Sequence, residues 1–284
     1  MNLLLLFLLG GLWGTSFLFI KIIVSEVGPL TLVTGRLAMA TILMWAILLL
    51  RGERPPRSWA RWRGYAILGL LNGALPYSLI SWGEQYIPSG WAALLQSTTP
   101  LFTILLAHVL TDDDRVTGEK IVGVLLGFAG VGLLMWPEVR GGISASLWGL
   151  LAIVGSSVSY AAAAIHAREH FGGQSPMVSS AGQFTMGLAL ILPLSFAFEQ
   201  PLAITPSPQA LASWAGLAVL GTVIAYAIYF YLIQRTSATF VTMTTYIVPI
   251  NGLILGALVL GEAISPILLV SLGLILGGVL LVRQ

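Results

Sequence analysis

Aromatic and amide side chains recur within the long apolar stretches of this sequence, and they are the residues best suited to recognising a small solute. Tyrosine and tryptophan combine a flat apolar face with a hydrogen-bonding edge, which suits an amphipathic molecule. Amides deep in an apolar helix face the protein interior, because their burial in lipid is costly. We therefore predict a substrate-binding pocket, with interhelical hydrogen bonding or an interfacial aromatic belt as the alternative for each residue. The candidates are Trp13, Asn72, Tyr77, Gln96, Tyr160, Tyr226, Tyr229, Thr245 and Tyr246.

Three prolines, Pro76, Pro100 and Pro249, fall near the middle of apolar stretches. A proline inside a helix lacks a backbone donor and frees the carbonyl four residues earlier, so the helix bends. Bends also occur for structural reasons alone. Three bends at similar depth instead favour hinged helices around a cavity, with freed carbonyls facing water or substrate.

Charged side chains are scarce inside the apolar stretches, and this limits the mechanism. Arg36 lies within the second stretch, while Lys21 and Glu84 lie toward the ends of theirs. Snorkelling is the alternative to a functional role for Lys21 and Arg36, and helix-end solvation is the alternative for Glu84. No Asp or Glu lies at the centre of a stretch, so we predict a facilitative carrier. A proton-coupled antiporter would have to use Glu84 or His108 as its relay.

One motif suggests a different chemistry. Residues His166 to His170 form H-x-x-E-H, the inverted zinc-protease signature. A zinc site needs a third protein ligand, and the nearest downstream carboxylate, Glu199, is predicted on the other side of the membrane. We therefore expect no metal, no cofactor and no catalytic residue. No phosphate-binding loop or G-x-S-x-G motif occurs, so ATP-driven pumping is not supported, and an intramembrane enzyme is the alternative of another class.

Composition indicates that the secondary-structure elements that position these residues lie in a lipid membrane. Of the 284 residues, 57% are hydrophobic and 8% are charged, with a mean hydropathy of +0.93. A soluble domain carries about a quarter charged residues and could not cover so apolar a surface. The net charge of +2 is too small to indicate the strongly basic surface that nucleic-acid-binding proteins carry. The chain has no cysteine, which excludes disulfides and thiolate metal sites.

Apolar runs separated by charges, Pro and Gly predict an all-α polytopic membrane protein with ten transmembrane helices. Long polar–apolar alternation is absent, which argues against a barrel. The first run lacks a basic N-terminal region and continues to Val24, so we expect an uncleaved helix and not a signal peptide. The predicted ranges are 3–24, 30–50, 64–86, 90–110, 119–136, 146–166, 179–198, 210–233, 238–260 and 264–282.

Basic residues indicate the orientation of these helices. Only Arg140 lies in a connection on one side of the membrane, and the positive-inside rule therefore places both termini in the cytoplasm. The basic residues on the cytoplasmic side are Arg51, Arg54, Arg57, Arg61, Arg63, Arg115, Lys120, Arg168, Arg235 and Arg283.

The two halves of the chain match in register. Tyr77 and Pro100 match Tyr226 and Pro249 at a shift of 149, and glycine pairs starting at positions 123 and 273 match at a shift of 150. An odd number of helices per half makes the halves enter the membrane from opposite sides. We therefore predict two inverted five-helix repeats, residues 1–140 and 141–284.

Four segments carry a family resemblance: Leu12–Phe17 running on to Lys21, Gly35–Ala38, Ala92–Phe102, and Leu260–Glu262 before the Gly-rich last helix. They resemble the drug/metabolite transporter superfamily, specifically its ten-helix EamA-type members, and the resemblance covers nearly the whole chain. It implies two inverted repeats, a cavity lined mainly by helices one, three, four, six, eight and nine, and export of amino acids or related metabolites. The chain departs from the family pattern at Asp112–Asp114, where a Gly-Glu pair is usual, and near Tyr160, where a frequent tryptophan is missing.

These features together predict a secondary transporter that exports amino acids or related small metabolites across the inner membrane by alternating access. Its partners would be the small-molecule substrate and the lipid bilayer, without nucleic acid, and a monomer is favoured over a dimer. A nucleotide-sugar or phosphate exchanger is disfavoured, because only Lys21 and Arg36 could meet a phosphate inside the membrane.

Overall fold

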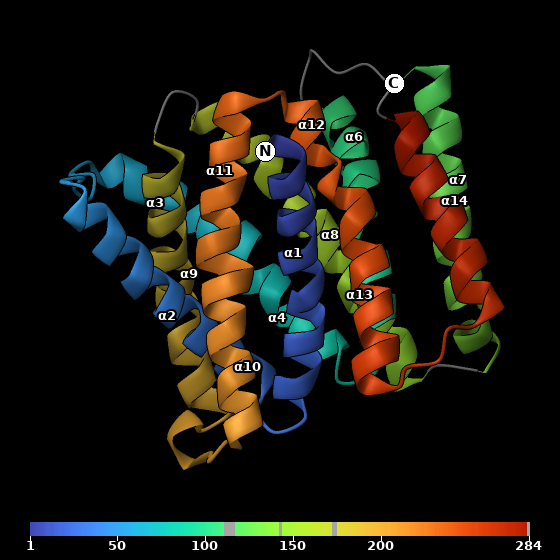
Figure 1. The fold of residues 1–284 in the computed structure, drawn as a ribbon, viewed down its shortest axis with the longest axis horizontal. Helices are drawn as coiled ribbons and strands as arrows, with labels where there is room; N and C mark the ends of the chain where they lie inside the picture. Colours follow the sequence, from blue (N-terminus) through green and yellow to red (C-terminus); the bar gives the residue numbers. More distant parts are fainter. Residues whose placement is uncertain (111–116, 142–143, 172–174, 283–284) are drawn as a thin grey trace.

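The computed structural model describes residues 1–110, 117–141, 144–171 and 175–282, and all regular elements in these ranges are helical (Figure 1). The first half contains α1 (Asn2–Val24), α2 (Pro29–Leu50), α3 (Trp59–Gly69), the π-helix η1 (Leu70–Ala74), α4 (Leu75–Gly83), α5 (Ser89–Gln96), α6 (Thr99–Leu110) and α7 (Gly118–Arg140). The second half contains α8 (Ala145–His170), α9 (Pro176–Phe198), the 3₁₀ turn η2 (Pro201–Ala203), α10 (Pro208–Ala218), the π-helix η3 (Val219–Ile224), α11 (Ala225–Arg235), α12 (Ala238–Thr242), α13 (Thr244–Leu260) and α14 (Pro266–Val282).

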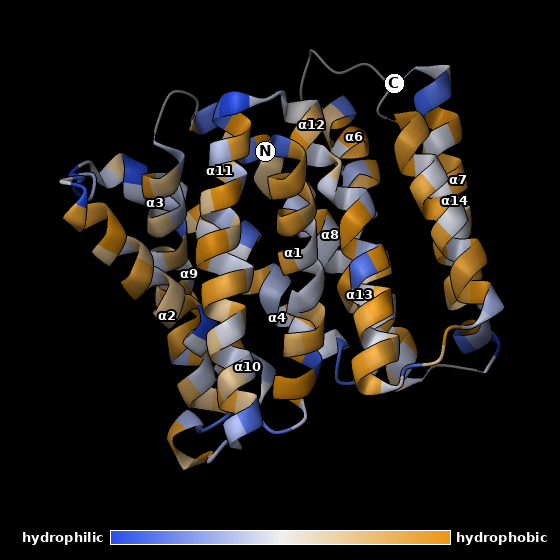
Figure 2. Ribbon diagram, viewed as in Figure 1, coloured by the Kyte–Doolittle hydropathy of each residue, from blue (hydrophilic) through white to orange (hydrophobic). Residues whose placement is uncertain are grey.

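Eight stretches of the described chain are long and apolar enough to cross a membrane. The α14 helix is apolar but shorter, and the stretch from α3 to α4 is divided by η1. Figure 2 shows hydrophobic residues along the helices and hydrophilic ones gathered at their connections. Large apolar side chains lie on the outside, with Val109 78% and Leu258 79% exposed, which suits a lipid solvent. The eight stretches are Asn2–Val24, Pro29–Leu50, Ser89–Leu110, Gly118–Arg140, Ala145–His170, Pro176–Phe198, Pro208–Arg235 and Phe240–Leu260.

The predicted ranges overlap these helices, but several ends differ. The α7 and α8 helices continue past the ends predicted at 136 and 166, so Arg140 and Arg168, predicted in connections, lie in the last turns of these helices. The third range is predicted as 64–86, but α3 begins at Trp59 and α4 ends at Gly83. The sequence places Arg61 in a connection because it is charged, yet it lies in the first turn of α3, where a long side chain reaches the membrane surface. The predicted features at Asp112–Asp114, Arg115 and Arg283 lie outside the described residues.

Packing between distant segments arranges the helices in pairs. The α2 helix packs on α9, α1 on α13, α4 on α8, and α7 on α14, and α7 and α14 stand together at one edge of the bundle (Figure 1). Close approach in the last pair uses Gly123, where an added Cβ would lie 2.7 Å from the carbonyl oxygen of Gly278. Of the glycines in α14, Gly278 makes this contact, whereas Gly273, which marks the repeat register in the sequence, has open space beside it.

The two ends of the bundle differ in what lies there. Figure 1 shows the start of α1 and the end of α14 at the same end of the bundle, which we call the terminal face. The α11–α12 connection lies at the terminal face too. The connections α1–α2 and α9–α10 lie at the other end, which we call the opposite face.

Candidate substrate cavity

A cavity of about 880 Å³ lies between helices of the two halves of the chain. Phe171, Pro176 and Val282 line its outer part, at or next to the terminal face, whereas Ile20 and Ile80 line its inner end. None of its described lining residues belongs to the connections at the opposite face. The cavity therefore extends to the terminal face and is closed toward the opposite face.

The π-helix η1 positions a polar group in the wall of this cavity. The wider π turn loosens the backbone ladder, and the carbonyl of Leu71 instead accepts a hydrogen bond of 2.8 Å from Ser159 Oγ of α8. Within the same turn, Asn72 Nδ2 donates to Gln183 Oε1 at 3.0 Å and to Tyr226 Oη at 3.4 Å. The break predicted at Pro76 thus lies just before that proline, and it links three separate segments through Asn72.

The second π-helix, η3, interrupts the segment from α10 to α11 in the same way. Thr222 Oγ1 donates to the carbonyl of Leu217, five residues earlier, at 3.1 Å. The same oxygen accepts a hydrogen bond of 3.0 Å from Arg36 Nε. No proline marks this break, so proline spacing did not reveal it. The repeat register does contain a signal, because a shift of 149 from Pro76 leads to Ala225, where η3 gives way to α11.

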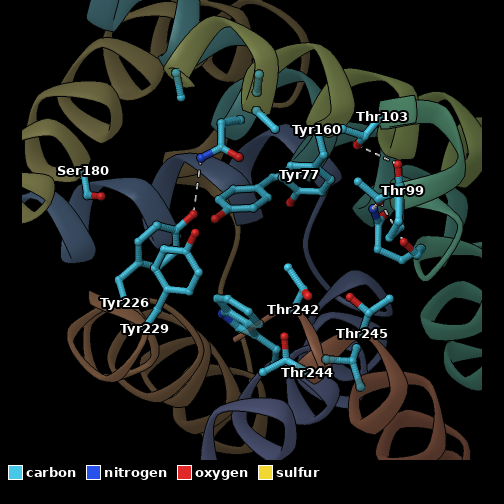
Figure 3. A pocket seen from close by; sticks show the side chains of 18 of the residues that line it. Tyr77, Thr99, Thr103, Tyr160, Ser180, Tyr226, Tyr229, Thr242, Thr244 and Thr245 are labelled. Atoms are coloured by element: carbon cyan, nitrogen blue, oxygen red, sulfur yellow. Dashed lines mark hydrogen bonds between the residues drawn. The ribbon is translucent and has the colours of Figure 1, made fainter. Parts of the chain in front are cut away.

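Aromatic rings form one wall of the cavity, which we call the aromatic wall: Trp13, Tyr77, Tyr160, Tyr226 and Tyr229. Trp13 meets Tyr229 with ring centroids 5.7 Å apart and Tyr226 edge-on at 6.3 Å. Tyr77 meets Tyr160 edge-on at 6.4 Å. Figure 3 shows the four tyrosines around the open space, with Tyr77 and Tyr160 side by side. Such contacts hold the rings in place, and the parts of the rings that face the cavity are available to a solute.

Threonines form the facing wall, which we call the hydroxyl wall: Thr99, Thr103, Thr242, Thr244 and Thr245 (Figure 3). Thr103 Oγ1 donates to the carbonyl of Thr99 at 2.9 Å, and Thr244 Oγ1 donates to the carbonyl of Val241 at 2.9 Å. Because these two hydroxyl protons are used in local backbone bonds, the oxygens of Thr103 and Thr244 remain as acceptors. The sequence predicts only Thr245 of this set.

The α5–α6 break lies at residues 97–98, directly before Pro100, and Gln96 holds it in place. Pro100 frees the carbonyl of Gln96, which accepts a hydrogen bond of 2.8 Å from Thr99 Oγ1. One acceptor site of the carbonyl that was predicted to face water or substrate is therefore used by Thr99. The side-chain amide of Gln96 accepts from Ser156 Oγ at 2.6 Å and donates to Thr99 Oγ1 at 2.9 Å. These contacts favour the interhelical alternative for Gln96, although it also lines the cavity.

Most of the predicted binding residues lie together, and one does not. Tyr246 packs beside the cluster of Leu101, Val124 and Val279 and is absent from the cavity wall. Pro249 is buried inside α13, and the backbone breaks earlier, at Met243. The cavity also receives residues from α2, α9 and α14, which the family resemblance does not imply. The predicted binding and kink residues that line it are Trp13, Asn72, Tyr77, Gln96, Pro100, Tyr160, Tyr226, Tyr229 and Thr245. Arg36, weighed in the sequence as a functional charge, lines it too, and residues not predicted include Ser179, Ser180 and Gln183.

The charged candidates are dispersed. Arg36 is buried in the cavity wall with its guanidinium carbon 3.8 Å from the centre of the Tyr77 ring, so snorkelling does not apply to it. Lys21 Nζ donates to the carbonyls of Glu84, at 2.5 Å, and Ile87, at 2.9 Å. Glu84 is fully buried, so helix-end solvation is wrong, and it lies outside the cavity. His108 is exposed near the end of α6, also outside the cavity.

Carboxylates close the opposite face by capping helix N-termini from other segments. Glu199 accepts from the backbone nitrogens of Leu30 (3.0 Å) and Thr31 (2.7 Å) at the start of α2. Glu26 accepts from Ser207 N and Oγ, both at 2.6 Å, before α10, and these bonds lower the pKa of Glu26. A negative charge at a helix N-terminus satisfies free N–H groups and the helix dipole. These contacts tie the connections at this face together.

A third carboxylate, Glu262, completes this arrangement. It accepts from the backbone nitrogens of Ser89, at 2.6 Å, and Gly90, at 3.0 Å, at the start of α5. Gly261 ends α13 with a positive φ of 68°, which only glycine adopts without strain, and this turn directs Glu262 toward α5. The Leu-Gly-Glu motif noted in the sequence is therefore a helix end followed by a cap for another helix.

The H-x-x-E-H motif forms a small histidine cluster. The rings of His166 and His170 stack 4.3 Å apart, and Glu169 Oε2 lies 3.9 Å from His170 Nδ1. Glu199 lies at the opposite face, where it caps α2. Within the described ranges, no group of three histidine, aspartate or glutamate side chains is arranged to hold a metal ion.

The apolar helices and the amphipathic cavity between them define a multi-pass helical membrane transporter. The EamA-like transporter family matches residues 1–136 and, a second time, residues 147–284. The chain therefore belongs to the EamA-like transporter family, within the drug/metabolite transporter superfamily.

Relatives agree with this assignment. An Escherichia coli K12 protein described as the uncharacterized inner membrane transporter YedA is 31% identical over 98% of this chain and 89% of its own length. A protein of Streptantibioticus cattleyicolor described as a probable terminal-alkyne amino-acid exporter is 27% identical over 96% of this chain and 90% of its own. A solved crystal structure with 23% identity superposes with a TM-score of 0.69, covering 99% of this chain and 95% of that one, and so shares the fold.

Proposed function

We propose that this chain is a secondary transporter that exports amino acids or related small metabolites across the inner membrane by facilitative alternating access. The observation that carries the proposal is the cavity that extends to the terminal face and is closed at the opposite face by Lys21 and three capping carboxylates. A carrier in this state receives its cargo from one side only, and opening of the opposite face would release it.

Ten transmembrane helices in two inverted repeats, residues 1–140 and 141–284, would perform this movement. In this arrangement α14 and the divided α3–η1–α4 stretch also cross the membrane. The π-helices η1 and η3 begin at Leu70 and Val219, again 149 residues apart. Packing is paired accordingly, because α4 meets α8 as α11 meets α1, and α6 meets α8 as α13 meets α1. Two separate matches to one family model support the same division.

The terminal face would be cytoplasmic, and thiol labelling tests this orientation. The chain has no cysteine, so Ser58→Cys and Thr205→Cys each introduce one exposed thiol, at the terminal and opposite faces respectively. A membrane-impermeant maleimide added to intact cells is expected to label Thr205→Cys and to spare Ser58→Cys until the cells are lysed. Labelling of Ser58→Cys alone in intact cells would reverse the orientation.

Amino acids are the proposed cargo because of the amphipathic cavity and because one relative is described as an amino-acid exporter. In proteoliposomes preloaded with amino acids, we expect accelerated counterflow without a proton gradient. Ala164→Trp would fill the cavity and lower counterflow by at least about tenfold, because Ala164 is exposed to it. Ala162→Trp, on the same helix but outside the cavity wall, serves as the control.

The same experiment separates the alternatives. Counterflow that required a pH gradient would contradict the facilitative mechanism and favour a proton-coupled antiporter, with buried Glu84 as the first residue to replace. Exchange of cationic drugs or nucleotide sugars in place of amino acids would contradict the proposal that amino acids are the cargo. An intramembrane enzyme is disfavoured, since the relatives are described as transporters.

A further inference from the structure

Arg36 is the one charged side chain among the described residues that line the cavity. It is 5% exposed and lies toward the closed end of the cavity, beside Tyr77. Its Nε donates to Thr222 Oγ1 at 3.0 Å, and its guanidinium carbon lies 3.8 Å from the centre of the Tyr77 ring. A hydrogen bond at one edge and a ring against one face fix the plane of the guanidinium group.

The rest of the guanidinium group is unpaired. Among the residues that the structure describes, no carboxylate forms an ion pair with Arg36, and its two terminal nitrogens have no hydrogen-bond acceptor. A buried cation without a counter-charge is unfavourable, and such residues within a membrane protein mark sites for ligands or ions. Lys21 differs, because its ammonium group donates to two backbone carbonyls.

We propose that Arg36 binds a carboxylate group of the substrate, so that the transporter selects carboxylate-bearing solutes over amines and cationic drugs. This rests on the proposed function and specifies its substrate class. The two free nitrogens present parallel N–H groups that match a carboxylate in a bidentate pair. The aromatic wall then receives an apolar side chain, while the acceptor oxygens of the hydroxyl wall suit an ammonium group.

Competition among matched ligands tests the proposal on the unmodified protein. L-phenylalanine counterflow would be measured against unlabelled L-phenylalanine, 3-phenylpropionate, L-phenylalaninamide and phenethylamine. We expect the two carboxylates to compete about ten- to one-hundredfold better than the amide and the amine, as hydrogen bonds to a charged group allow. Equal competition by L-phenylalanine and L-phenylalaninamide would overturn the proposal while leaving amino-acid transport intact.

Variants locate the effect. Arg36→Gln is expected to weaken competition by L-phenylalanine about ten- to one-hundredfold and competition by L-phenylalaninamide less than about threefold. Arg36→Lys retains the charge without the bidentate geometry. Competition by L-phenylalanine in this variant should therefore be weaker than in the unmodified protein and stronger than in Arg36→Gln. Arg51→Gln, an exposed cation at the end of the same helix, is the control. If Arg36→Gln fails to fold, Thr222→Val keeps the guanidinium group and removes the acceptor of its Nε, together with the local bond to the Leu217 carbonyl. It should show the same selective loss on a smaller scale.

A direct binding measurement separates failure of this inference from failure of the proposed function. If no amino acid is exchanged, the proposed function fails. The melting temperature of the purified protein is then compared in 3-phenylpropionate and in L-phenylalaninamide. Stabilisation by the carboxylate alone, lost in Arg36→Gln, supports the anion site, and equal stabilisation by both ligands overturns it.

Discussion

Replacing Lys21 with methionine is expected to open the opposite face of the transporter. The Lys21 ammonium group donates to the carbonyls of Glu84 and Ile87 and so ties α1 to the α4–α5 connection. Hydrogen bonds to a charged group contribute about 1.5–3 kcal/mol each. Losing both should destabilise the closed state relative to the open state by about 3 kcal/mol, which changes the ratio of the two states roughly a hundredfold. A cysteine introduced at Ile80, at the inner end of the cavity, reports this opening. In Lys21→Met it should react with an impermeant thiol reagent added at the opposite face.

Glu84 supplies the control for this prediction. Both of its carboxylate oxygens are buried without a hydrogen-bond partner among the described residues, and Lys21 and Glu262 are its charged neighbours. Removal of Lys21 would withdraw the positive charge that favours the ionised form of this buried carboxyl group, which is destabilising. Lys21→Met with Glu84→Gln should therefore recover part of the lost melting temperature. A double variant no more stable than Lys21→Met would show that the two charges are not coupled.

Glu262→Ala is expected to cost about 2 kcal/mol of stability and to loosen α5 from α13. The change removes both acceptors of the Ser89 and Gly90 backbone donors, and helix caps and charge-assisted bonds are worth about this much. Glu262→Gln keeps one neutral acceptor and should have a smaller effect. The measurement is the melting temperature in detergent together with the thiol reactivity of the Ile80 cysteine.

Glu119→Ala is the matched control for this replacement. Glu119 is also a glutamate at a helix start, but it is exposed in the first turn of α7. It should change the melting temperature little, because exposed charges contribute weakly. Equal effects of Glu262→Ala and Glu119→Ala would mean that the contact between Glu262 and α5 does not stabilise the closed face.

Residue type and depth were enough to predict much of the cavity wall. Trp13, Tyr77 and Tyr226 fall in apolar helices at similar depth, and polar groups at that depth avoid lipid, so they converge on the interior. Helix boundaries followed from the apolar runs for the same reason. Tyr246 shows the limit of this argument, because an interior position also exists between helices, where it packs near Leu101 and not in the cavity.

The remaining features depend on contacts between residues far apart in the chain. The caps formed by Glu26, Glu199 and Glu262 each join a connection to a helix more than 160 residues away, and no local pattern encodes such a pair. Arg36 looked like a residue that could snorkel because Thr222 and Tyr77, which hold it, are distant in sequence. The hydroxyl wall was missed because threonine is an ordinary residue of membrane helices.

The π-helix η1 changes which residues of its helical stretch share a face. Leu68 and Asn72 line the cavity four positions apart, but the next lining residue, Tyr77, follows after five. An uninterrupted α-helix would have turned Leu75 and Pro76 inward, whereas Leu75 is 40% exposed and absent from the cavity wall. One additional residue in a turn rotates everything beyond it by about 100°. The stretch thus behaves as two short helices with independent faces, and an insertion or deletion in η1 would change what the cavity presents to its cargo more than it would change the length of the helix.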